Sequence, residues 1–466
     1  MLSVQSNSRY FYLIISLFFK IVINIFLVFY IAKNVSVADF GSFSLAFLIY
    51  SLCVLLIDYG FNLKGLVLNK NNKETVNHEI SSMISAKIIL VILMCLVLFL
   101  FLRISNYNSE TDLNILILCF ASIPNSFGLF FLNKFKIINR YDKESVGFIL
   151  QGFVLLLSVA MFNYYGKDEV IWYIYSILLS KLIFFAYGLF SYIRNDYFEF
   201  KIAGINMAIE SIRYSFPFAM HLILGALIIY IDTLVLSSLS DLNNVAIYQS
   251  GMRIIMASLL ISVIISDAFI PLISNSFSSS KKVKNSMMSL FEFILLFLFL
   301  VVITLFFFKK TIIILLYSLD YIELEKYIIY IIGIISLRYI GVVPGILLTS
   351  FGKQNIRANA VIISVLFSIV LNYIFIPRFN IEGAFLSSFI SHLILNMIYM
   401  YYALKIVSLI KLDQYKLLFL LILICFGLQY FVFSDSINFL IITVILNLII
   451  IIGYVLYRNI HKKLSI

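Results

Sequence analysis

The sequence has few charged residues, and this shortage excludes most classes of soluble protein. Only 12% of the 466 residues are Asp, Glu, Lys or Arg, whereas soluble domains contain about 25%. Apolar residues make up 63% of the chain, and the mean hydropathy is +1.06. Repeated apolar runs of about 20 residues are typical of helices that cross the hydrocarbon core of a bilayer. We therefore expect an all-α integral membrane protein.

The sequence also lacks the motifs of an enzyme or of an ATP-driven pump. It contains no HExxH motif, no P-loop and no pair of carboxylates in the middle of an apolar run. The four cysteines lie singly in apolar runs without a CxxC pair, so we interpret them as packing residues. The sequence thus predicts a transporter without a cofactor, driven by an ion gradient or by the membrane potential.

Apolar segments separated by polar breaks predict about 14 membrane helices. The first segment is too long for a signal-peptide core and has no small-residue cleavage site, so we expect it to be retained as a helix. A short interfacial piece is expected at 311–316. The predicted helices cover residues 10–32, 38–58, 82–102, 113–132, 146–163, 169–193, 212–236, 245–270, 287–308, 327–349, 357–377, 383–405, 416–433 and 437–457.

The loops predict the orientation of the chain. Most of the loop Lys and Arg residues lie in alternate segments that include the N-terminus, and the positive-inside rule places such segments in the cytoplasm. We therefore expect both termini in the cytoplasm and an even number of helices. Because the same loops account for the net charge of +11, this charge does not indicate a nucleic-acid partner.

A weak internal repeat suggests two halves. Residues 39–46 (DFGSFSLA) follow the first helix, and residues 244–251 (NVAIYQSG) follow the seventh with the same order of small, aromatic and small residues. Six helices separate the copies, so the halves have the same orientation. Isoleucines at helical spacing in 202–212 predict an amphipathic surface helix between them. The predicted parts are 1–200 (lobe of helices one to six), 201–213 (cytoplasmic linker), 214–410 (lobe of helices seven to twelve) and 411–466 (a last helix pair).

Basic residues inside the predicted helices indicate the charge of the cargo. A charge at membrane depth costs at least a few kcal/mol, so it is kept mainly where it faces water, a partner or a cargo. Near mid-membrane the basic residues outnumber the acidic ones, which favours an anionic cargo. Lys87 is an exception, because it lies close to a helix end and is expected to snorkel to the interface. The predicted substrate cavity is lined by Lys20, Asn24, Lys181, Arg253 and Arg338.

The environment of these groups has more than one interpretation. Lys20 and Asn24 share one helix face, and this face either contacts phosphate or sugar or pairs with an acidic neighbour. His221 and His392 are either packing groups or proton-coupling groups, since histidine titrates near neutral pH. Asp232 lies near a helix end and is expected to pair with a basic residue when the outer side is closed. We therefore predict His221, Asp232 and His392 as coupling or gate residues.

Two serine-containing strips lie on the eleventh and twelfth predicted helices. Each strip repeats a polar residue at every fourth position, so its side chains share one face. Such strips bind sugar hydroxyls or join helices through hydrogen bonds. The strips are Ser364, Ser368 and Asn372, and Ser388, His392 and Asn396.

Several short segments carry a family resemblance. They are residues 39–43 (DFGSF), 57–61 (IDYGF), 248–253 (YQSGMR), 269–272 (FIPL) and 372–377 (NYIFIP) followed by Gly383 and Ala384. In their order and spacing the chain resembles the multidrug/oligosaccharidyl-lipid/polysaccharide (MOP) exporter superfamily, and specifically its Wzx-type O-antigen flippases. The chain departs from that pattern at residues 35–37 (VSV), where the family often has Leu-Gly-Pro.

The resemblance implies a fold and a function. The implied fold has two six-helix lobes in a V around a central cavity, with a trailing helix pair. The implied function is to move an undecaprenyl-pyrophosphate-linked oligosaccharide, an O-antigen or capsule repeat unit of lipopolysaccharide or polysaccharide biosynthesis, by alternating access. It would cross from the cytoplasmic to the periplasmic leaflet of the bacterial inner membrane. The implied partners are membrane lipids, a polysaccharide polymerase and a chain-length regulator.

The residues are also compatible with three other functions. A multidrug exporter of the same superfamily carries organic cations and should have an acidic residue where this chain has Lys20. A membrane-embedded polymerase or glycosyltransferase usually needs a large outer loop or a carboxylate-rich site. A scaffold subunit of a glycan assembly complex needs no charges in a cavity.

Overall fold

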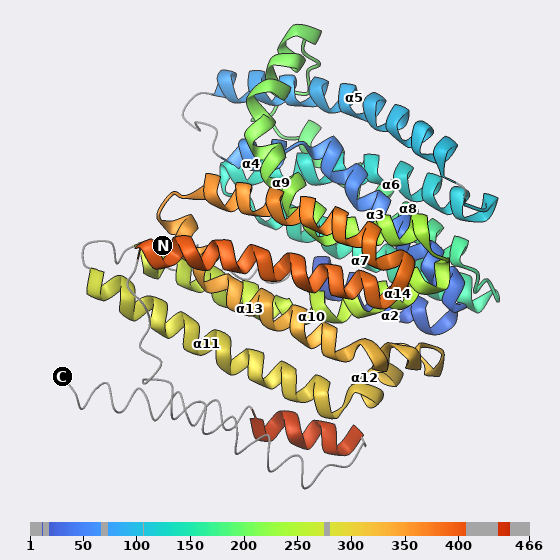
Figure 1. Cartoon of the computed structure of the whole chain (residues 1–466). Helices are drawn as coiled ribbons and strands as arrows, with labels where there is room; N and C mark the ends of the chain where they lie inside the picture. The colour runs from blue at the N-terminus through green and yellow to red at the C-terminus, as the bar shows by residue number, and fades with distance from the viewer. Residues whose placement is uncertain are drawn as a thin grey trace. The chain divides into compact units, whose positions relative to one another are not determined.

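The computed structural model describes residues 12, 18–66, 73–105, 107–274, 280–406 and 437–447. Over these residues the chain is helical and forms no strand (Figure 1), which confirms the all-α expectation. Ten helices within this part are long and apolar enough to cross a membrane. The count of 14 stays a prediction, because residues 407–436 and 448–466 lie outside the described residues.

The chain divides into two compact units, Met1–Tyr230 and Ile231–Ile466. The division falls within one long helix, α9 (Ile205–Leu239). The amphipathic segment expected at 201–213 is helical from Ile205 onward and continues directly into the seventh predicted helix. The lobe boundaries given above stay a prediction.

The first unit is built around the pair α6 and α8. Helix α6 packs against α8 and α3, and α7 packs against α8 (Figure 1). At the α6–α8 contact, a Cβ added to Gly188 would lie 3.1 Å from the carbonyl oxygen of Gly128, so small residues permit close approach of the two backbones. The elements of this unit before α9 are η1 (Phe18–Val22), α2 (Ile23–Asn34), α3 (Val37–Asp58), α4 (Phe61–Leu66), α5 (Lys73–Ile104), α6 (Ser109–Lys134), η2 (Phe135–Ile138), α7 (Asp142–Tyr164) and α8 (Val170–Ile193).

Helix α3 ends at a turn that requires glycine. Tyr59 adopts a left-handed conformation with φ 46°, and Gly60 follows with φ 78°. A Cβ added to Gly60 would lie 2.5 Å from Cβ of Phe218 on α9. Both the positive φ and the close contact therefore favour glycine at this position. The turn brings the end of α3 beside α5 and α6, where buried charges gather.

The connection from α8 to α9 is fastened along α5, and we call residues 195–204 the strap. Asn77 of α5 donates to the Tyr197 carbonyl (3.1 Å) and accepts from the Glu199 amide (3.2 Å). Ser85, two turns further along α5, donates to the Ala203 carbonyl (3.0 Å) and accepts from its amide (2.7 Å). These side chains satisfy backbone groups that have no helical partner.

The second unit is centred on α13, which packs against α14, α10 and α11 (Figure 1). Helix α14 contains one non-helical residue, Asn380 (φ 47°, ψ −122°), so it comprises the two helices expected at 357–377 and 383–405. The short piece expected at 311–316 is α12. The elements after α9 are α10 (Leu242–Ser274), α11 (Ser280–Phe307), α12 (Lys309–Leu316), η3 (Leu319–Tyr327), α13 (Ile328–Ser350) and α14 (Gln354–Ile406), with a further helix at Ile437–Asn447.

Candidate functional site

Lys20 lies in an unusual helical turn. The segment Phe18–Val22 is a π-helix with Lys20 at its centre, and π-helical turns are rare and frequent at functional sites. The Lys20 side chain is exposed, and its Nζ lies 5.7 Å from the centre of the Phe148 ring on α7. Among the described residues, no carboxylate forms an ion pair with it.

Lys181 lies close to Lys20 and has the same charge. It is only 8% exposed on α8, makes no ion pair or hydrogen bond to another described residue, and is repelled by Lys20. Phe184, one turn further along α8, packs on Phe148 with ring centres 5.1 Å apart. Lys20 thus contacts one ring of this pair, and Lys181 lies one helical turn from the residue that carries the other. Two neighbouring cations that form no ion pair with a described carboxylate attract an anion of matching charge.

Asn24 has a local role in the same region. Its Nδ2 donates to the Lys20 carbonyl at 2.5 Å, so the amide supports the turn that carries Lys20. This contact uses one donor of the side chain. Direct contact between Asn24 and a cargo stays a prediction.

Lys87 is buried in an ionic cluster, so the expectation that it snorkels is wrong. Its side chain is completely buried, and Nζ lies 2.7 Å from Oγ of Ser126, 3.3 Å from the Ile57 carbonyl and 3.8 Å from Oδ1 of Asp58. The carboxylate at the end of α3 holds the ammonium inside the unit, which is why it does not reach the interface. Lys87 is therefore a structural group rather than a cargo ligand.

Lys134 is a second buried lysine of this cluster, which the sequence did not single out. It is 1% exposed, donates to the Phe61 carbonyl (3.3 Å), and lies 4.1 Å from the centre of the Phe130 ring. Asp58 attracts it electrostatically. One carboxylate thus faces two buried ammonium groups. We name the group of Asp58, Lys87 and Lys134 the lysine cluster.

Asp232, in the second unit, is buried among neutral donors. Its carboxylate accepts hydrogen bonds from the Tyr248 hydroxyl (3.2 Å), the Asn372 amide (2.6 Å) and the Ser368 hydroxyl. No ion pair to Asp232 exists within the described part of the chain, and pairing with a basic residue when the outer side is closed stays a prediction. A proton or a small cation would neutralise such a carboxylate, since oxygen atoms are the ligands that hard cations prefer.

The predicted strips on α14 contribute mainly to contacts between helices. Ser368 and Asn372 reach Asp232 of α9, as described above. In the second strip Asn396 donates to the Leu337 carbonyl of α13 (2.9 Å) and to the His392 carbonyl (2.9 Å). Of the two interpretations of these strips, the described contacts favour helix joining.

Arg338 and His392 lie near the Asp232 group. Arg338 on α13 is half-buried, with Nη1 3.9 Å from the Met256 sulfur, and its charge acts on both Tyr248 and His392. His392 is itself buried. Arg338 thus acts electrostatically on His392 and on Tyr248, a hydrogen-bond partner of Asp232, while the roles of Arg338 and His392 in transport stay predictions.

The two remaining predicted site residues are Arg253 and His221. Arg253 lies on α10 and acts electrostatically on Tyr317, whose hydroxyl donates to the Ser250 carbonyl (2.7 Å). His221 lies in α9, and its side chain is outside the described residues. The cavity role of Arg253 and the coupling or gate role of His221 therefore stay predictions.

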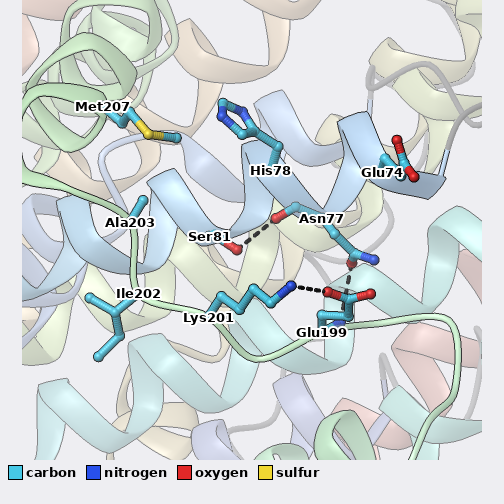
Figure 2. Close-up of a pocket in the computed structure, with 9 residues that line it drawn as sticks. All are labelled: Glu74, Asn77, His78, Ser81, Glu199, Lys201, Ile202, Ala203 and Met207. Carbon is cyan, nitrogen blue, oxygen red and sulfur yellow. Dashed lines mark hydrogen bonds and ion pairs between the residues drawn. The ribbon is translucent and has the colours of Figure 1, made fainter.

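A surface groove of about 430 Å³ lies where the strap meets α5 (Figure 2). Figure 2 shows the Lys201 ammonium directed at the Glu199 carboxylate, 2.6 Å away, and this contact lowers the pKa of Glu199 below its ordinary value. The groove thus presents charges of both signs. It is lined by Glu74, Asn77, His78, Ser81, Glu199, Lys201, Ile202, Ala203 and Met207.

Neither this groove nor any other described part of the chain contains three His, Cys, Asp or Glu residues that could hold a metal ion. The mixed charge of the groove provides no preference for an anion. The Lys20–Lys181 pair therefore stays the predicted anion site of the first unit.

Two protein families match the chain. Residues 8–277 match the family described as polysaccharide biosynthesis protein, and residues 217–374 match the family MatE. Because the first match covers more than half of the chain, the chain belongs to the polysaccharide biosynthesis protein family. No curated protein matches the chain significantly.

Solved structures show the same fold. The lipid II flippase MurJ in an inward closed conformation matches with a TM-score of 0.73 and 16% identity, over 98% of this chain and 99% of that chain. An inward-facing multidrug resistance MATE family transporter matches with a TM-score of 0.69 and 13% identity, over 83% and 94%. A MOP superfamily transporter from Pyrococcus furiosus, described as having a binding pocket of reverse polarity, matches with a TM-score of 0.60 and 13% identity, over 85% and 94%. The chain therefore has the fold of MOP superfamily transporters.

Proposed function

We propose that the protein is a Wzx-type flippase that moves an undecaprenyl-pyrophosphate-linked oligosaccharide, an O-antigen or capsule repeat unit, to the periplasmic leaflet of the inner membrane. The observation that carries this proposal is the pair Lys20 and Lys181, two ammonium groups that repel each other and form no ion pair with a carboxylate among the described residues. A diphosphate supplies the negative charges that this pair lacks. Membership of the polysaccharide biosynthesis family and the fold shared with a lipid II flippase support this choice.

The direction of movement follows from electrostatics. With both termini in the cytoplasm, an anionic headgroup moves outward, away from the negative interior of the cell. Each negative charge then gains up to about 2.3 kcal/mol per 100 mV of membrane potential. The oligosaccharide would pass by alternating access while the prenyl chain stays in the lipid.

A drug exporter of the same superfamily is the second candidate, and the match of residues 217–374 to MatE favours it. Exporters of organic cations need a negative group to bind the cargo. The first unit offers the opposite charge at Lys20 and Lys181, which favours an anionic cargo.

The proposed function is tested by deleting the gene in its own host. We expect the deletion to remove surface polysaccharide and to accumulate lipid-linked repeat units on the cytoplasmic side, and the restored gene to reverse both effects. Surface polysaccharide at the normal level in the deletion strain would contradict the proposal. Sensitivity to cationic drugs without a polysaccharide defect would support the second candidate.

We further propose Asp232 as a coupling residue. Asp232→Asn keeps one oxygen, which can still accept from Ser368 and Asn372, and places an amide group where Tyr248 donates. The change removes the charge that a proton or cation would neutralise. Export should fall by about tenfold, as expected when about 1.4 kcal/mol of coupling is lost. The measurement is export at several external pH values and sodium concentrations, and the variant should no longer respond to the coupling ion.

The matched control is Asp241→Asn. Asp241 is an exposed residue whose carboxylate accepts from the amide of Asn244, and its replacement should leave export and ion response unchanged. An Asp232→Asn protein with the ion response of the wild type would show that Asp232 serves only packing.

A further inference from the structure

Glu144, in the first turn of α7, is a buried carboxylate beside the Lys20–Lys181 pair. It is 6% exposed, and the Nζ of Lys136 contacts its two oxygens at 2.9 and 2.8 Å. Lys136 lies in η2, so the ion pair joins two elements of the first unit. None of the sequence patterns above selects Glu144, because it resembles any acidic residue at a helix start.

The helix geometry places Glu144 on the side of Lys20. Phe148 follows Glu144 by four residues, so both side chains lie on the same face of α7. Lys20 lies over the ring of Phe148. Lys20 is attracted by Glu144 and repelled by Lys136, although no ion pair between Lys20 and Glu144 is formed. The carboxylate therefore acts electrostatically on Lys20 while it forms an ion pair with Lys136.

Each of these charges acts on the next: Lys136 pairs with Glu144, Glu144 attracts Lys20, and Lys20 repels Lys181. An anion that binds between Lys20 and Lys181 must compete with Glu144 for the ammonium of Lys20. The strength of that competition depends on how firmly Lys136 holds Glu144.

We propose that Glu144 is a positioning residue that sets the affinity of the Lys20–Lys181 pair for the diphosphate of the cargo. This inference rests on the proposed function. With the site empty, Glu144 offsets the repulsion between Lys20 and Lys181. When a diphosphate binds, its negative charges offset the repulsion between Lys20 and Lys181 in place of Glu144. When the diphosphate leaves, Glu144 offsets this repulsion again, which favours release. A transport site needs such moderation, since binding must be strong enough for entry and weak enough for exit.

Two substitutions at the same ion pair should act in opposite directions. Glu144→Gln removes the competitor and its repulsion of the anion, so the diphosphate should bind more tightly. Lys136→Met releases Glu144 toward Lys20, so the diphosphate should bind more weakly. If the ion pair served only the fold, both substitutions would break it and would change binding in the same direction.

The experiment measures binding of farnesyl diphosphate to the purified full chain in lipid nanodiscs, with farnesyl monophosphate and farnesol as reference ligands. We expect Kd to fall by about fivefold in Glu144→Gln and to rise by about fivefold in Lys136→Met, a size typical of one nearby charge. Asp142→Asn is the control, because Asp142 lies two residues from Glu144 and pairs with the half-exposed Arg140. Its Kd should match that of the wild type.

A conservative variant tests the role of Glu144 even if Glu144→Gln does not fold. Glu144→Asp keeps the charge and a carboxylate for Lys136 but withdraws it from Lys20, so Kd should fall by a smaller factor than in Glu144→Gln. An unchanged Kd in Glu144→Asp and Glu144→Gln, or shifts of the same sign in Glu144→Gln and Lys136→Met, would overturn the role of Glu144. A wild-type protein that binds farnesol as well as farnesyl diphosphate would instead overturn the proposed function itself.

Discussion

Export of the lipid-linked oligosaccharide should fall by about a hundredfold or more when Lys20 and Lys181 are both replaced by Gln, because charged hydrogen bonds contribute about 1.5–3 kcal/mol each. Gln is of similar length and can still donate a hydrogen bond, so the change removes charge with little change in volume. Each single replacement should have a smaller effect, since one ammonium group still faces the diphosphate. The measurement is surface polysaccharide in a deletion strain that expresses each variant at equal protein level.

The control for this prediction is Lys33→Gln. Lys33 is exposed in the last turn of α2, the helix that follows the turn of Lys20, and its replacement should leave export unchanged. Replacement of both lysines by Arg should retain much of the export, because Arg keeps the charge. Normal export in the double Gln variant would show that the two ammonium groups do not bind the cargo.

Asp58→Asn should destabilise the first unit by about 3–5 kcal/mol, the usual cost of leaving a buried charge without its partner. Asp58 is the carboxylate that faces the buried ammonium groups of Lys87 and Lys134. The amide keeps the shape of the side chain but leaves two buried positive charges without compensation. The measurement is thermal unfolding of the purified protein together with its yield in the membrane.

A second substitution separates charge from shape in the lysine cluster. Adding Lys87→Met to Asp58→Asn removes one of the two uncompensated charges, so stability should recover in part. The comparison variant is Lys64→Met, whose partner Glu79 is 41% exposed; this pair should contribute less than about 1 kcal/mol. A double variant less stable than Asp58→Asn alone would contradict the account of the lysine cluster.

The sequence was sufficient to predict the membrane helices of the described part, because hydrophobic length is a local property. It also identified Lys20 and Lys181 as charges inside apolar runs. The turn at Asn380 was expected as well, since polar residues interrupt the apolar pattern there.

Partners across helices could not be predicted in the same way. Lys87 and Asp58 are far apart in sequence, and only the packing of α3 against α5 brings them together. Lys134 lies at a helix end, where a basic residue is ordinarily exposed, and its burial depends on the turn at Gly60. The π-helical turn around Lys20 likewise has no signal in the apolar pattern.

The strap also limits how the first unit can change shape. Four hydrogen bonds from Asn77 and Ser85 tie residues 197–203 to α5. The start of α9 follows directly, so it cannot slide along α5 unless those bonds break or α5 travels with it. We therefore expect α5 and the start of α9 to move together as one rigid body during a transport cycle. Spin labels on these two segments would then keep a constant separation while other helices rearrange.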